Sequence, residues 1–194
     1  MLEPLAAAEP ELVPSPGLTE LAAAALGGDR RAADRLWEEA GLRLRRVGLA
    51  LGARPEDVPD LVQDTLIAAH RHLRRFDPAR GTFEAWAAAI LVRRAKNLRR
   101  AEGRRLRLLD RFRLLSRPAA PSRTSDEADA RAVLDLLLRS LTESQREVVA
   151  LYEIGELSAE ETAGVLDITA GGVRSIARDA RRRLAEAARK EKRS

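Results

Sequence analysis

The stretch LTESQREVVALYEIGELSAEETAGVLDITAGGVRSIARDARRRL, residues 141–184, decides the fold of this chain. Two capping boxes divide it into helices: Thr142 stands three residues before Gln145, and Ser158 stands three residues before Glu161. In each box the polar side chains satisfy backbone N–H groups that are free at a helix start. The stretch is therefore predicted to contain short helices that begin next to Thr142 and Ser158.

The helix that begins after Ser158 is expected to end in a turn at Asp167, and Thr169 is expected to cap a second helix. This second helix has two faces. Apolar residues recur at helical spacing and are predicted to face inward: Val173, Ala177, Ala180 and Leu184. The opposite face is basic and consists of Arg174, Arg178, Arg181 and Arg182. Such a helix-turn-helix fits the major groove of DNA, where arginine binds guanine and the flanking phosphates.

The remaining sequence also predicts helices and no strands. Residues 1–17 hold four prolines without a helical period and are expected to form a disordered tail. Residues 18–115 follow a helical pattern, and residues 116–126 are rich in Pro, Ser and Thr without an apolar face. We therefore predict an all-α chain of two small helical domains, 18–115 and 127–194, joined by the flexible linker 116–126.

The net charge is only +5, but the basic residues are concentrated in two segments. Residues 93–113 hold ten Lys and Arg against two acidic residues, and residues 174–193 hold nine against three. The rest of the chain is therefore acidic. Two separate cationic segments on an acidic body indicate two contacts with a polyanion and a different partner elsewhere.

Several classes of protein are disfavoured by the composition. The chain has no cysteine, which excludes disulfides and thiolate metal sites. We find no paired histidines and no phosphate-binding glycine loop, so we expect no catalytic residues, no metal, no cofactor and no enzyme activity. The longest apolar run, residues 85–92, is far shorter than the roughly 20 residues of a membrane-spanning helix. The first 17 residues hold three Glu and no basic residue, unlike a signal peptide, so we expect a cytoplasmic protein without membrane insertion.

Three motifs, in this order, make the chain similar to a bacterial RNA polymerase sigma factor of the extracytoplasmic-function type, within the sigma-70 family. DLVQD at residues 60–64 resembles the acidic segment with which the family docks on the largest polymerase subunits. FDP at 76–78, followed by FEAW at 83–86, resembles the loop and helix that capture and open the −10 promoter element. Residues 141–184 resemble the helix-turn-helix that reads the −35 element. The likeness covers about residues 20–190.

The resemblance implies three groups of binding residues. Those expected to bind core polymerase are Asp60, Leu61, Gln63 and Asp64. Those expected at the −10 element are Asp77, Arg80, Thr82, Trp86, Arg93, Lys96, Asn97 and Arg100. The four residues from Arg93 to Arg100 in this list are spaced to share one helix face. Those expected at the −35 element are Thr169, Arg174, Ser175, Arg178, Arg181 and Arg182.

The implied function is that of a sigma factor, which binds core RNA polymerase, directs it to promoter DNA and promotes opening of the −10 region. The alternative is a stand-alone helix-turn-helix regulator that binds duplex DNA without polymerase. The DLVQD segment and the second basic segment favour the sigma factor. An anti-sigma factor is a further partner that the resemblance allows. The sequence leaves open which promoters are read and whether such a factor, the N-terminal tail or control of abundance restrains activity.

Overall fold

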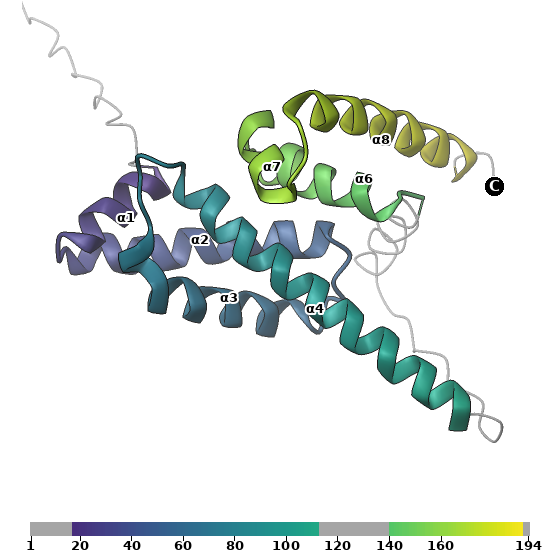
Figure 1. Cartoon of the computed structure of the whole chain (residues 1–194), viewed down its shortest axis with the longest axis horizontal. Helices are drawn as coiled ribbons and strands as arrows, with labels where there is room; N and C mark the ends of the chain where they lie inside the picture. Colours follow the sequence, from purple (N-terminus) through teal and green to yellow (C-terminus); the bar gives the residue numbers. More distant parts are fainter. Residues whose placement is uncertain (1–16, 113–139, 192–194) are drawn as a thin grey trace, which may run out of the picture.

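The computed structural model describes residues 17–112 and 140–191, and every regular element in these ranges is a helix (Figure 1). The N-terminal module, residues 17–112, contains α1 (Leu18–Leu26), α2 (Arg30–Ala50), α3 (Val58–His72), the 3-10 turn η1 (Leu73–Arg75) and α4 (Phe83–Phe112). The C-terminal module, residues 140–191, contains α6 (Glu143–Val148), the π-helical segment η3 (Val149–Ile154), α7 (Ala159–Leu166) and α8 (Ala170–Glu191). The predicted all-helical fold is confirmed. Our predictions for the tail and for the linker lie outside the described residues, apart from Gly17.

The N-terminal module is built on α2, α3 and α4, which lie side by side (Figure 1). α2 begins where the Asp29 carboxylate accepts hydrogen bonds from the backbone N–H groups of Arg31 and Ala32, at 2.9 and 3.1 Å. Its buried residues recur every three or four positions, as a helix with one inward face requires. α4 begins with Phe83, which is fully buried in the same core. The start of α4 is therefore anchored in the core.

The helix-turn-helix forms as the sequence predicts. Ser158 Oγ accepts from the backbone N–H of Glu161 at 3.1 Å, and α7 ends at Asp167, whose φ of 57° is left-handed. Thr169 Oγ1 accepts from the N–H of Gly172 at 3.0 Å and so caps α8. The predicted inner face of α8 is confirmed, because Val173, Ala177 and Ala180 are buried and Leu184 is half-buried.

The two modules share one hydrophobic core, which the sequence did not predict. Ala150, Leu151 and Leu157 of the C-terminal module belong to the same buried cluster as the apolar residues of α2 and α4. A Cβ on Gly155 would lie 3.2 Å from Val47 Cγ2 of α2, so the backbone after η3 approaches α2 closely. We call this contact surface, in which η3, α6, α7 and Leu157 meet α2 and α4, the seam.

Gly52, in the loop between α2 and α3, also lies at the seam. Its φ of 80° is left-handed, a conformation that favours glycine. A Cβ at this position would lie 2.9 Å from a guanidinium nitrogen of Arg146 of α6. The turn and the close approach of the second module therefore both favour glycine at this position.

Candidate nucleic-acid interface

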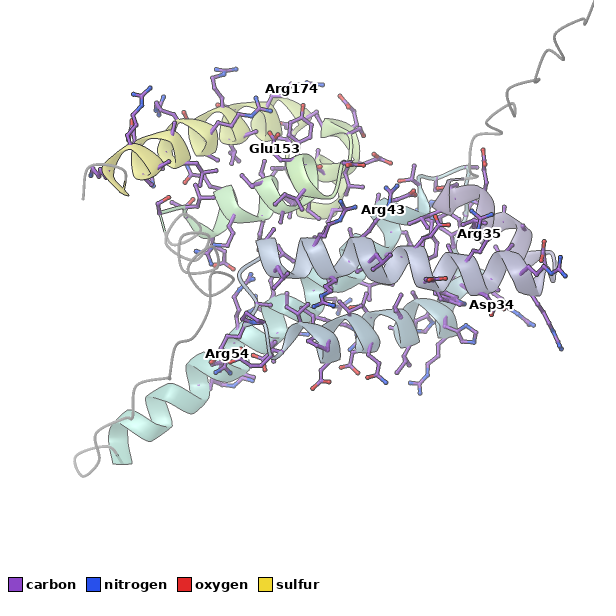
Figure 2. The ribbon with its side chains drawn as sticks, turned by 180° about the vertical axis from the view of Figure 1, so that it is seen from behind. Asp34, Arg35, Arg43, Arg54, Glu153 and Arg174 are labelled. Carbon is purple, nitrogen blue, oxygen red and sulfur yellow. The ribbon has the colours of Figure 1, made fainter. Side chains whose placement is uncertain are left out.

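Helix α8 lies on the side of the C-terminal module away from α2 and α4 (Figure 1). Arg174, Arg178, Arg181 and Arg182 are all exposed, as predicted. Three of them lie beside carboxylates: Arg174 is 2.6 Å from Glu160, Arg181 is 2.6 Å from Glu153, and Arg182 is 3.0 Å from Asp179. Figure 2 shows Arg174 at the outer edge of the ribbon. Exposed ion pairs contribute little free energy, so a nucleic-acid phosphate can replace these carboxylates at small cost.

The loop before α4 is a tight turn with an aromatic floor. Asp77 accepts a hydrogen bond from the N–H of Ala79 at 3.0 Å through its carboxylate, and one from the N–H of Arg80 at 3.0 Å through its carbonyl oxygen. Trp86 is half-buried, with its ring centroid 5.7 Å from that of Phe76. The loop, Trp86 and one side of α7 line a groove of about 580 Å³. Such a groove has the aromatic and polar groups that hold an unstacked base.

The loop also contacts the C-terminal module directly. The hydroxyl of Thr82 donates a hydrogen bond to the Glu161 carboxylate of α7, 79 residues further along the chain. Burial would raise the pKa of Glu161, but hydrogen bonds from Thr82 and from the N–H and hydroxyl of Ser158 outweigh this effect and lower the pKa below its usual value. Glu161 is therefore an anion at neutral pH. It accepts the hydrogen bond of the Thr82 hydroxyl, and Thr82 is one of the residues predicted to bind DNA.

The basic residues of α4 divide between two sides of the helix. Arg93, Asn97 and Arg100 are exposed, whereas Lys96 is half-buried, with its Nζ 3.1 Å from Glu147 Oε2 of α6. Lys96 and Arg100 line a groove between α4 and α6. Asn97 instead lines a different groove, between α3 and α4. Of the four residues expected to share a helix face, Lys96 is thus paired with α6, while the other three are exposed.

Arg99 is a residue of this interface that the sequence reasoning missed. Its Nη2 lies 2.8 Å from Glu143 and 3.1 Å from Glu147, and its Nη1 donates to the carbonyl oxygen of Leu51 at 3.3 Å. It follows Lys96 by three positions, so both cations point toward α6. That spacing was the available signal, but nothing in the local sequence shows that acidic residues 44 and 48 positions away face it.

The acidic segment of α3 presents three of its four predicted residues to solvent. Asp60, Gln63 and Asp64 are exposed, and Asp64 lies 3.3 Å from Arg94 of α4. Leu61 is 5% exposed and belongs to the hydrophobic core. A buried Leu61 positions the polar residues on either side and offers little surface of its own to a partner.

The described residues, 17–112 and 140–191, contain no group of three or more His, Asp or Glu arranged to hold a metal ion. No helix within them is both long and apolar enough to span a membrane. The two histidines are on the exposed side of α3, where His70 packs against Trp37 with ring centroids 5.4 Å apart. This contact accounts for His70 without a ligand.

Comparison with known proteins matches both modules. The family described as Sigma-70 region 2 matches residues 36–105, and the family described as Sigma-70, region 4 matches residues 131–184. RNA polymerase sigma factor CnrH of Cupriavidus metallidurans is 32% identical over 173 residues, which cover 84% of this chain and 90% of CnrH. The sigma factor SigM of Mycobacterium tuberculosis is 33% identical over 177 residues, covering 86% of this chain and 82% of SigM.

Solved structures agree. CnrH in complex with the cytosolic domain of CnrY has a TM-score of 0.67 at 29% identity, covering 88% of this chain and 96% of CnrH. RpoE of Bartonella quintana, in complex with the anti-sigma factor NepR, has a TM-score of 0.66 at 25% identity, covering 80% of this chain and 96% of RpoE. The helical modules, in this order, are those of a two-region sigma factor. The chain belongs to the extracytoplasmic-function group of the sigma-70 family. It directs RNA polymerase to promoters, and its partners are the core polymerase and promoter DNA.

Proposed function

We propose that three separate surfaces of this chain divide the work of initiation. The exposed acidic face of α3 binds core polymerase, the basic face of α8 reads the −35 duplex, and the loop 77–82 with α4 holds the opened −10 strand. The observation that carries this proposal is the separation of charge: the arginines of α8 and the carboxylates of Asp60 and Asp64 are exposed on different modules. A protein that binds both polymerase and DNA needs such a division, because a cationic surface also at the polymerase contact would attract DNA there.

At the −35 element, the residues proposed to contact DNA are Thr169, Arg174, Ser175, Arg178, Arg181 and Arg182. Arg174 and Arg178 lie near the start of α8, where a recognition helix meets base edges. Thr169 already accepts the capping hydrogen bond from Gly172, but its hydroxyl can still donate to a phosphate. Arg181 and Arg182 lie further along the helix and suit phosphate contacts.

At the −10 element, the proposed residues are Asp77, Arg80, Thr82, Trp86, Arg93, Lys96, Asn97 and Arg100. Opening duplex DNA costs about a few kcal/mol per flipped base, and the protein recovers this by stacking the base and holding its phosphates. The ring of Trp86, which is half-buried, supplies the stacking surface, and the cations of α4 supply the phosphate contacts.

Duplex reading and strand opening are tested separately by matched substitutions. On a genomic fragment that the chain and core polymerase transcribe, Arg174→Ala or Arg178→Ala should each cost about 1–3 kcal/mol in duplex binding if the side chain touches base edges. Arg93→Ala or Asn97→Ala should spare duplex binding and reduce permanganate reactivity of the −10 region. A promoter with a pre-opened −10 bubble should restore the activity of the Arg93 and Asn97 variants more than that of the two α8 variants. The reverse pattern would show that these roles are assigned the wrong way round.

The polymerase contact is proposed for Asp60, Gln63 and Asp64. We expect the double substitution Asp60→Arg, Asp64→Arg to weaken co-elution with core polymerase while the far-UV spectrum stays that of the native fold, because both side chains are exposed. Asp34→Arg on α2 is the control, since Asp34 is exposed on another helix (Figure 2). Unchanged co-elution of the double variant would remove this surface from the proposal.

The finer domain boundaries, 18–115 and 127–194, belong to the same proposal and are supported by the two family matches. We propose that the chain acts in the cytoplasm as a binding protein without catalytic residues of its own. We also propose an anti-sigma factor as a partner, because CnrH and RpoE were solved in complex with CnrY and NepR. Run-off transcription by core polymerase with and without the chain tests the function as a whole, and stimulation that needs the chain is the expected result.

A further inference from the structure

Acidic side chains of the C-terminal module reach the proposed −10 surface at two points. Glu161 of α7 accepts the hydrogen bond of Thr82 at the start of α4. Glu147 of α6 binds Lys96, with 3.1 Å between Oε2 and Nζ. Lys96 lies about three helical turns further along α4 than Trp86. The C-terminal module therefore lies across the path along which a single strand would run from the loop to the cations of α4.

We propose, resting on the function proposed above, that the C-terminal module is an intramolecular inhibitor of strand capture. In the free chain its carboxylates take the positions that DNA phosphates need, and the chain engages an opened strand after the modules separate at the seam. The occupant of the −10 surface in the free protein is thus a segment of the same chain, α6 to α7.

The chemistry of the seam supports this competition. Glu147 is 7% exposed, and its two oxygens each face one cation, Lys96 and Arg99. A carboxylate and a phosphate both accept charge-assisted hydrogen bonds from such a pair, so they compete for the same donors. Removing the carboxylate from these half-buried cations leaves their charges unpaired, whereas its exchange for a phosphate keeps the charges paired.

The proposed inhibition affects capture of the opened strand and spares duplex binding. The arginines of the basic face of α8 are exposed in the closed chain, and Figure 2 shows Arg174 at the outer edge of the ribbon. Arg93 and Arg100 of α4 are also exposed. The closed chain is therefore expected to bind duplex DNA through α8, while Thr82 and Lys96, at the two covered points, are unavailable to an opened strand.

The apolar part of the seam explains why the closed form is favoured until another surface replaces it. Leu151 is fully buried and Leu157 is 5% exposed, and both pack in the core shared with α2 and α4. Separation of the modules exposes these side chains to water, which is unfavourable unless a partner covers them. We propose that core polymerase, a partner of this chain, is what covers them in the open form.

A reversible cross-link across the seam tests the proposal in the full-length chain. Gly103 of α4 and Ser144 of α6 line the same groove, and neither belongs to the proposed binding residues. An added Cβ at Gly103 has no atom within 4 Å, and Ser144 is exposed, so Gly103→Cys and Ser144→Cys should both fold. Because the chain has no native cysteine, a bis-thiosulfonate reagent links this pair alone.

The linked chain should bind duplex fragments as the reduced chain does, but it should fail to open the −10 region with core polymerase, and reductant should restore opening. The two single-cysteine variants, treated with the same reagent, are the controls for modification itself. A linked chain that still opens promoters, or a pair that does not link in the free chain, would overturn the proposal. A reduced chain that fails to stimulate transcription would instead refute the proposed function, so the two failures differ.

A charge variant tests the same competition without a cross-link. Glu147→Gln removes the acceptor shared by Lys96 and Arg99 and should lower cross-linking of the cysteine pair and raise promoter opening about fivefold, the factor that corresponds to about 1 kcal/mol. Glu186→Gln of α8 removes the same charge from an exposed position of the same module and should change neither. Equal effects of the two variants would show that net charge, and not occupancy of the seam, controls opening.

Discussion

Truncation of Leu151 to alanine is the most direct test of whether the seam stabilises the N-terminal module. Leu151 lies in η3 of the C-terminal module but is fully buried in the core shared with α2 and α4. The two tryptophans of the chain, Trp37 and Trp86, both lie in the N-terminal module, in α2 and α4. Tryptophan fluorescence therefore reports unfolding of one module, while the substitution is made in the other.

The expected magnitude follows from complete burial. A buried Leu→Ala substitution costs about 2–5 kcal/mol, and the lower part of this range applies here because a contact between modules can relax more readily than a closed core. We expect Leu151→Ala to lower the tryptophan-reported free energy of unfolding by about 2 kcal/mol. For a small protein this is a shift of about 1 M in the urea midpoint.

The assay is urea unfolding of the full chain, followed in parallel by tryptophan fluorescence and by far-UV circular dichroism. Ile168→Ala is the control, because Ile168 is 38% exposed in the turn between α7 and α8 and its truncation should stay within about 0.5 kcal/mol. A fluorescence midpoint for Leu151→Ala equal to that of the wild type, with a lowered dichroism midpoint, would refute the reasoning. The seam would then add nothing to the stability of the N-terminal module.

Three further predictions concern the C-terminal module. Since folding lowers the pKa of Glu161, its ionised form adds stability above the ordinary pKa of 4.5, and this stability is lost as the pH falls through the lower folded value. Urea midpoints of Glu161→Gln should therefore fall less than those of the wild type between about pH 5 and pH 3, and parallel curves would contradict the assignment. Gly171→Ala should raise the melting temperature more than Gly172→Ala, because the added methyl lies 4.0 Å from Thr169 Oγ1 in the first case and 3.2 Å in the second. Duplex binding by the full chain should weaken steeply with salt, as arginine contacts to phosphate require, and an affinity that stays flat up to physiological salt would exclude such contacts.

The parts of the structure that the sequence predicts well are those with local causes. The caps at Thr142 and Ser158 involve residues three positions apart, and helical spacing alone separates the inner from the outer face of α8. The outward position of Asp60 and Asp64 follows from the same periodicity. Each of these features depends on a few consecutive residues, which is why sequence patterns suffice.

The seam was not predicted because its cause is not local. Leu151 and Leu157 look like leucines of the core of their own module, and helical spacing cannot show that they pack against α2. The ion pairs of the seam are equally hard to predict. Arg99 and Glu147 are 48 residues apart, and either could be a solvated surface residue of its own helix. Leu61 was predicted to bind polymerase because the family motif includes it, but the fold buries it in the core.

Glu161 shows how a residue with a complete local explanation can also act at a distance. Its Oε2 accepts from the N–H and the hydroxyl of Ser158, each at 2.8 Å, and these bonds form the capping box of α7. Its Oε1 is left to accept from Thr82 of the other module. Because the two oxygens serve different partners, separation at the seam breaks the contact with Thr82 and leaves the cap intact. The helix-turn-helix can therefore release the −10 surface without unfolding, which is what a switch between closed and open forms of this chain requires.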